Sequence, residues 1–102
     1  MSVYLEYEEA ANIFEELGNW KAAGQCYFSA KKYQKAFKSF EAAGMNKQAG
    51  ESLEMLCRYE EAAQFYEQDG NYLKVIECLD MLNEWDQILA VIQKYSPKMT
   101  KA

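Results

Sequence analysis

Hydrophobic residues recur along this chain with a strict period. Written in blocks that begin at Tyr7, Trp20, Tyr33 and every thirteenth position after them, the sequence has an aromatic residue at the first position of six of its seven blocks. The fourth position is alanine in five blocks, and the eighth is always aromatic or aliphatic. No insertion or deletion interrupts the blocks, which span residues 7–19, 20–32, 33–45, 46–58, 59–71, 72–84 and 85–97.

Each block has the pattern of a short helix. Its apolar residues fall at positions 1, 4, 5 and 8, which share one face of an α-helix. Glycine stands at position 12 of alternate blocks, where helices commonly end in a left-handed residue: Gly18, Gly44 and Gly70. Asn19 and Asn71 are placed to cap the helices that follow, and Pro97 is expected to end the last block. We predict helices over residues 6–17, 20–30, 33–43, 46–56, 59–69, 72–82 and 85–95.

Helices of this length are marginally stable alone and must pack on neighbours. Short connections make consecutive helices antiparallel, and a small residue at position 4 lets their backbones approach. The pattern therefore predicts an all-α fold, an α-solenoid of seven short antiparallel helices, or about 3.5 hairpins of 26 residues. We expect one helical-repeat domain over residues 1–102. A compact seven-helix globule is the alternative, which the strict regularity disfavours.

The second and third blocks resemble a known repeat family. The run Trp20-x2-Ala23-Gly24-x2-Tyr27 is similar to the first-helix motif of the tetratricopeptide repeat, and Ala36, Phe40 and Ala43 match its second-helix motif. The period of 26 residues is shorter than the family's roughly 34. Short-helix repeats of this kind occur in vesicle-coat and ciliary-transport subunits, in soluble fusion-attachment proteins, and in helicase-like proteins with tetratricopeptide and ankyrin repeats. The resemblance implies a solenoid that binds other proteins.

The amino-acid composition excludes several kinds of catalytic and metal-binding site. The 102 residues include no histidine, which removes histidine general bases, the usual triads and most zinc sites. Three cysteines without a CxxC motif predict free thiols in a reducing compartment, with Cys26 and Cys78 buried and Cys57 exposed. Paired glutamates in first turns match the helix dipole, so we expect no catalytic residue, metal ligand or cofactor. No run is apolar and long enough to span a membrane.

Charge is distributed in blocks. Residues 1–20 carry five acids and no base, and residues 21–47 carry six lysines against one acid. Residues 51–86 carry ten acids against two bases, and residues 87–102 add three lysines, which gives −5 overall. A solvated surface explains this pattern, and so does docking of a polarised partner or of a second copy. The acidic balance makes nucleic acid an unlikely partner, although a small lysine patch for RNA stays open.

The resemblance also implies a binding groove lined by the first helix of each hairpin. Transferred position by position, its partner-binding residues are Lys21, Gln25, Phe28, Lys47, Glu51, Glu54, Met55, Leu73, Glu77, Asp80 and Met81. Independently, Phe28, Met55, Leu73 and Met81 lie off the apolar stripe of their helices, and such residues are typical of partner surfaces or of packing between hairpins. We therefore expect these apolar residues to be exposed in one strip with an acidic flank.

We expect a non-catalytic protein–protein interaction scaffold, intracellular and cytoplasmic, that binds a peptide or helix of a partner protein. The ligand expected for this strip is basic and amphipathic. The alternatives are an accessory or docking segment of a larger transport-complex subunit or helicase-like enzyme, and a small enzyme. The last helix is highly apolar (Ile88, Leu89, Val91 and Ile92), so self-association through it is a further expectation.

Overall fold

Residues 3–99 are described by a computed structural model, and within them the chain is all-helical. Seven helices follow one another with no strand in this part of the chain. They are α1 (Val3–Glu16), α2 (Trp20–Ser29), α3 (Tyr33–Ala42), α4 (Asn46–Met55), α5 (Tyr59–Asp69), α6 (Tyr72–Met81) and α7 (Trp85–Met99). The all-α prediction is confirmed, and the interior helices begin and end within one residue of the predicted bounds.

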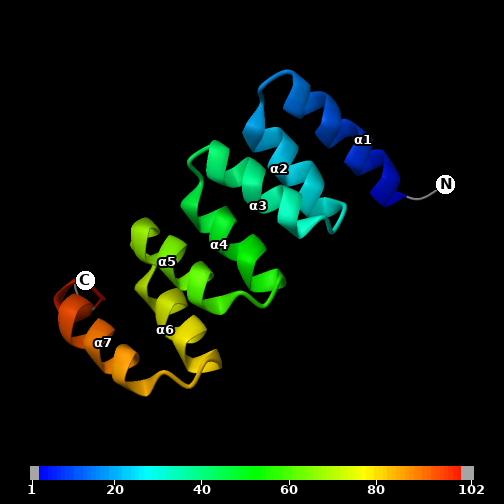
Figure 1. Ribbon diagram of the computed structural model, residues 1–102. Coiled ribbons are helices and arrows are strands. Elements are labelled where there is room, and N and C mark those ends of the chain that lie inside the picture. The colour runs from blue at the N-terminus through cyan, green and yellow to red at the C-terminus, as the bar shows by residue number, and fades with distance from the viewer. Residues whose placement is uncertain (1–2, 100–102) are drawn as a thin grey trace.

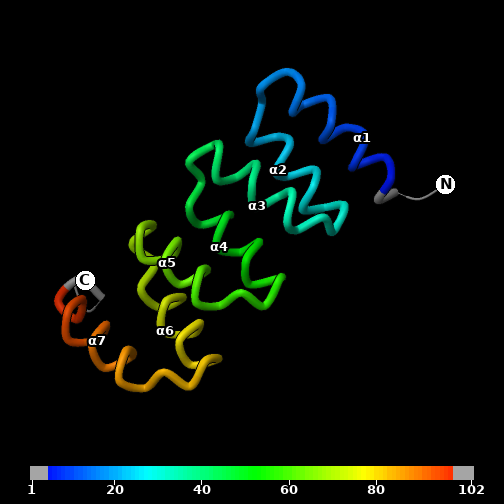
Figure 2. Tube along the Cα trace, in the orientation of Figure 1, coloured from blue at the N-terminus to red at the C-terminus, as the bar shows by residue number. Residues whose placement is uncertain are grey.

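The helices form an elongated array of 48 × 24 × 20 Å. Each helix packs mainly against its neighbours in the chain, as expected for a solenoid. Figure 1 shows that the connections alternate between the two edges of the array, and the trace in Figure 2 follows the same zigzag. The connections after α1, α3 and α5 share one edge, and those after α2, α4 and α6 share the other.

All six connections have the same backbone structure. At the α4–α5 connection the Arg58 N–H donates to the Leu53 carbonyl (2.9 Å), and the Arg58 carbonyl accepts from the Ala62 N–H (3.0 Å). One residue therefore closes one helix and opens the next, in the manner of a Schellman motif. The equivalent residues at the other connections are Asn19, Lys32, Met45, Asn71 and Glu84. This recurrence is the structural basis of the period in the sequence.

The residue at position 12 is left-handed at every connection. Gly18, Gly44 and Gly70 have φ of 72–79°, as predicted. The same conformation occurs on the other edge without glycine, at Lys31 (φ 62°), Cys57 (φ 59°) and Asn83 (φ 57°). These three were not predicted, because the residue types at 31 and 57 give no signal for positive φ. The predicted caps are confirmed: the Asn19 and Asn71 side chains accept from Ala22 N and Lys74 N at 3.2 and 3.4 Å.

Two expectations about the ends are wrong. The first helix begins at Val3 rather than at residue 6. Pro97 does not end the last helix, because α7 continues through it to Met99. A proline in a helix removes one hydrogen bond to the carbonyl four residues earlier. Gln93 and Pro97 are both exposed, so water can reach the carbonyl that loses its donor.

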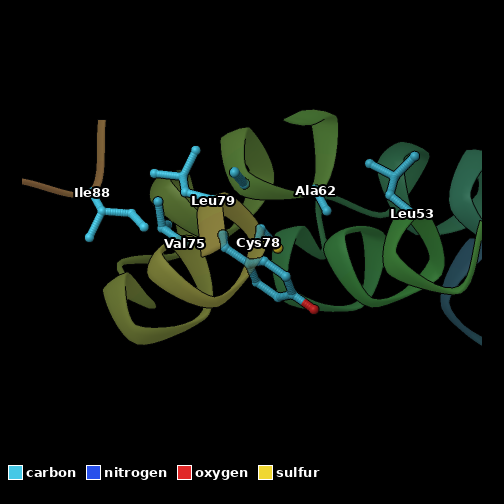
Figure 3. Packing of buried hydrophobic residues seen from close by; sticks show 8 residues of the cluster. Leu53, Ala62, Val75, Cys78, Leu79 and Ile88 are labelled. Atoms are coloured by element: carbon cyan, nitrogen blue, oxygen red, sulfur yellow. The ribbon is translucent and has the colours of Figure 1, made fainter. Parts of the chain in front are cut away.

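The core is built mainly from positions 4, 5 and 8 of the blocks, with Cys78 added from position 7. The position-4 alanines of α2–α5 are fully buried. One cluster joins α1–α4, and a second, drawn in Figure 3 as a row from Leu53 to Ile88, joins α4–α7. Phe37 and Phe65 pack against both clusters and meet edge to face at 5.4 Å. The core is therefore continuous along the array.

Two glycines inside helices allow aromatic rings to approach the backbone. A Cβ atom on Gly24 would lie 2.7 Å from the Phe40 ring, and one on Gly50 would lie 3.0 Å from the Tyr66 ring. In both pairs a position-5 glycine contacts the position-8 ring of the next helix. This close approach defines the contact between α2 and α3 and between α4 and α5.

Overpacking tests the position-4 contact. Ala49 has no exposed surface, so Ala49→Leu forces extra methyl groups between α4 and its neighbours. We expect a loss of about 1–3 kcal/mol in the free energy of unfolding, measured by urea denaturation. Ala42→Leu, at an exposed position of α3, is the control and should change it little. An unchanged Ala49→Leu variant would remove this position from the helix interface.

A second substitution tests the left-handed connections. Cys57→Gly relieves a β-carbon held at positive φ, so it should raise the free energy of unfolding by about 1 kcal/mol. Asn83→Gly should gain less, because asparagine tolerates this conformation better. Urea denaturation of both variants measures the difference. A destabilised Cys57→Gly protein would contradict the connection geometry described here.

Candidate partner-binding surface

The predicted strip runs along α2, α4 and α6, and it contains two neighbouring hollows. The first lies between α2 and α4 and encloses about 270 Å³. Gln25, Phe28 and Ser29 line it from α2, and Gln48 and Glu51 line it from α4, with the buried Phe40 ring below.

The second hollow lies between α4 and α6 and encloses about 300 Å³. Glu54 lines it from α4, and Glu77, Asp80 and Met81 line it from α6. Tyr59, at the start of α5, also lines it. Its walls are therefore richer in carboxylates than those of the first hollow.

The structure brings most of the predicted residues together. Seven of the eleven line the two hollows: Gln25, Phe28, Glu51, Glu54, Glu77, Asp80 and Met81. The other four lie on the same three helices outside the hollows: Lys21, Lys47, Met55 and Leu73. Phe28 differs from expectation, because it is half-buried and packs edge to face on Tyr33 at 5.1 Å. Met55, Leu73 and Met81 are exposed as predicted.

The acidic flank is weaker than the sequence suggested, because a lysine neutralises part of it. Lys74 Nζ lies 3.2 Å from Glu54 and 3.1 Å from Glu77, and the Tyr66 hydroxyl also donates to Glu54. The strip predicted from the sequence includes Glu54 and Glu77, but it does not include Lys74 or Tyr66. Within the described residues, no ion pair involves Glu51 or Asp80, so these two carboxylates keep their charge available for a ligand.

A spacing in the sequence could have revealed this arrangement. Glu54, Tyr66 and Lys74 have counterparts three blocks earlier in Glu15, Tyr27 and Lys35. The Tyr27 hydroxyl donates to Glu15 (2.7 Å) just as Tyr66 donates to Glu54, and it also lies 2.7 Å from Oδ1 of Asn12. Each lysine ammonium lies over its tyrosine ring, at 5.7 Å for Lys35 and 5.6 Å for Lys74. The recurring arrangement therefore spans three helices.

Because the shift is three blocks, an odd number, this equivalence relates odd-numbered helices to even-numbered ones. The α4–α6 hollow thus has a counterpart between α1 and α3, lined by Trp20, Lys35 and Lys38 among others, and enclosing about 430 Å³. The α2–α4 hollow has a counterpart of about 340 Å³ between α5 and α7. The structural unit is one block, a single helix with its connection, so hollows occur between odd-numbered helices as well as between even-numbered ones.

Burial and hydrogen bonding shift the pKa values of groups behind the hollows. Burial, followed by the bond to Glu15, raises the pKa of Tyr27 to about 12. Burial, followed by the bond to Glu54, raises the pKa of Tyr66 above its ordinary value. The bond to Glu77 is the main cause of a raised pKa at Lys74. These tyrosines stay neutral donors and Lys74 stays charged at neutral pH, so the three-helix arrangement is held together there.

The cysteines lie largely as predicted. Cys78 is buried, Cys57 is exposed and Cys26 is half-buried, and all three are free thiols. Burial, reinforced by the negative charge of Glu54, raises the pKa of the Cys78 thiol to about 11. Within residues 3–99 no three histidine, cysteine or acidic side chains gather where they could hold a metal ion. None of the described helices is long and apolar enough to cross a bilayer.

Comparison of the chain with protein-family models, with curated proteins and with solved structures finds no match. The arrangement of helices is consistent with a helical-repeat solenoid, and the tetratricopeptide likeness stays a prediction from the sequence motifs.

Alkaline pH tests the buried thiol. The ordinary pKa of cysteine is 9.0, and that of Cys78 is raised to about 11. Above pH 9 the unfolded thiol ionises while the folded one keeps its proton, so the free energy of unfolding falls as pH rises from 9 to 11. Urea denaturation at pH 8 and pH 10 should show a smaller fall for Cys78→Ala than for the wild type.

Val75→Ala is the matched control, since it shortens another buried residue of the same cluster without removing a titratable group. It should be less stable than the wild type at both pH values and keep the wild-type dependence on pH. A Cys78→Ala variant with an unchanged dependence would contradict the burial of this thiol.

Proposed function

We propose that this chain is a non-catalytic, tetratricopeptide-like interaction scaffold that binds a peptide or helix of a partner protein along α2, α4 and α6. The observation that carries the proposal is the pair of consecutive hollows on these helices, with exposed Met55, Leu73 and Met81 near them. Exposed apolar groups beside polar hollows are typical of protein-binding surfaces, and methionine adapts to varied partners. We expect the protein in the cytoplasm, where free thiols stay reduced.

The charge of the strip favours a basic, amphipathic ligand. Glu51 in the first hollow and Asp80 in the second are the carboxylates best placed to meet basic side chains. Glu54 and Glu77 contribute less, since a ligand would have to compete with Lys74 for them. Apolar anchors should therefore supply most of the affinity, and Glu51 and Asp80 should mainly affect the association rate and its dependence on salt.

An accessory or docking segment of a larger transport-complex subunit or helicase-like enzyme is the alternative function. It is favoured by the exposed apolar residues of α7, which further helices of the same kind could cover. A segment that only spaces or docks other domains would select no ligand for the strip, so one experiment separates the two functions.

That experiment is a selection from a displayed library of amphipathic peptides of 15–20 residues, which correspond to roughly four to six turns of helix. Selected peptides should be basic, and Met55→Ala with Met81→Ala should weaken their binding about tenfold or more. Asp80→Asn should change the affinity less, and mainly through the association rate. Calorimetry and surface plasmon resonance measure the two effects.

Leu5→Ala on α1 is the matched control, because Leu5 and Met55 are both 51% exposed. It should leave peptide binding unchanged. Peptides that bind the double-alanine variant as tightly as the wild type would show that the strip is not the binding surface. A library that yields no binder at all would favour the accessory-segment function.

A further inference from the structure

The last helix leaves the contact positions of the repeat uncovered. Positions 5 and 8 lie between consecutive helices, where Gly24 meets Phe40 and Gly50 meets Tyr66. All position-8 residues of α2–α6 are buried. On α7 the position-5 residue Leu89 is 58% exposed, whereas the position-5 residues of α1, α2, α4 and α5 are buried. The face of α7 that a following helix would cover is therefore apolar and open.

The first helix is open on the opposite side. Position 7 is buried in α3, α4 and α6, at Ser39, Ser52 and Cys78. Its counterpart on α1, Ile13, is 58% exposed, and Leu17 is more exposed still. Phe14, at position 8, is only half-buried, whereas its interior counterparts are buried. The face of α1 that a preceding helix would cover is thus apolar and open as well.

The two open faces complement each other in the register of the repeat. At the α2–α3 and α4–α5 pairs, position 5 of one helix meets position 8 of the next, and Phe37 at position 5 of α3 packs against the cluster that contains Leu53 at position 8 of α4. Leu89 on α7 lacks a position-8 partner, and Phe14 on α1 lacks a position-5 partner. One contact between Leu89 and Phe14 of a second copy would satisfy both, whereas pairing α7 with α7, or α1 with α1, brings together two faces of the same kind.

Charge favours the same pairing. The five charged residues of α1 are all glutamates, whereas α7 carries two lysines, Lys94 and Lys98, and one acid, Asp86. Two α1 helices would repel each other, and so would two lysine-bearing ends. The acidic residues 51–86 belong mainly to α5 and α6, which lie behind α7 from this end. An acidic α1, with a charge of −5, against an α7 with a net charge of +1 is the attractive combination.

We propose that α7 of one copy packs against α1 of a second copy in the geometry of a consecutive helix pair, so that copies join end to end. The contact is heterologous, and both ends of a joined pair stay open. The assembly should therefore lengthen with concentration rather than stop at a dimer. This surface lies at the ends of the array and is independent of the peptide-binding strip, so either proposal can fail alone.

Two single substitutions test the proposal on the 102-residue chain. Leu89→Lys blocks the α7 face, and Ile13→Lys blocks the α1 face; both positions are 58% exposed, so neither variant should lose its fold, as circular dichroism would check. Sedimentation velocity from about 10 μM to 1 mM covers the range of weak homotypic contacts. The wild type should exceed its monomer mass of 11.8 kDa increasingly with concentration, and each variant alone should stay a monomer.

The decisive sample is an equimolar mixture of the two variants. It retains one intact α7 face and one intact α1 face, so it should form a dimer of twice the monomer mass and nothing larger. Gln68→Lys adds the same charge at an exposed position of α5 and should associate like the wild type. A wild type that is monomeric throughout would overturn the proposal. So would an Ile13→Lys variant that still dimerises alone while Leu89→Lys does not, since that result means α7 pairs with α7.

Discussion

The structure depends on one residue at each connection, which hydrogen-bonds both helices it joins. Arg58 donates to the carbonyl of Leu53 and accepts from the N–H of Ala62, and its five equivalents do the same. These bonds satisfy the end of one helix and the start of the next within a short connection. The exit of each helix therefore fixes the entry of the following one, which is why a repeat of one short helix can build a regular array.

This constraint explains the different roles of the positions within a block. Helices this short are marginally stable alone, so positions 4, 5 and 8 must supply contacts on both sides. The sizes at positions 5 and 8 are matched at two of these contacts, where glycine faces an aromatic ring: Gly24–Phe40 and Gly50–Tyr66. A Cβ atom at Gly24 would require the Phe40 ring to move, and because the core is continuous, that shift would extend to neighbouring contacts.

The repeat is predictable from the sequence because the backbone geometry of each block requires residues of a particular size at fixed positions and favours glycine at position 12. Left-handed residues are predicted at Gly18, Gly44 and Gly70 and missed at Lys31 and Cys57, where the tertiary array imposes a conformation that the residue does not prefer. The sequence predicts which helices carry the candidate strip, but it overestimates the negative charge of the strip, because Lys74 neutralises part of it. Whether Glu54 faces a ligand or Lys74 depends on contacts between separate helices, which no local pattern encodes.

Helices three blocks apart are equivalent, so contacts that hold the helices together can be distinguished from side chains that would contact a ligand. The α1–α3 and α4–α6 hollows share a tyrosine–glutamate hydrogen bond and a lysine over the tyrosine ring at equivalent positions. The ion pairs of the two lysines are not shared, because Lys35 pairs with Glu8 and Lys74 pairs with Glu54 and Glu77. The hollows also differ where side chains meet solvent: Lys38 lines the first hollow, and Glu77 occupies the equivalent position in the second. A ligand would therefore distinguish them by charge as well as by volume, which is about 430 Å³ for the first and about 300 Å³ for the second. Because both hollows keep the same tyrosine–glutamate bond, surface residues at these positions can change without disturbing the helices that present them.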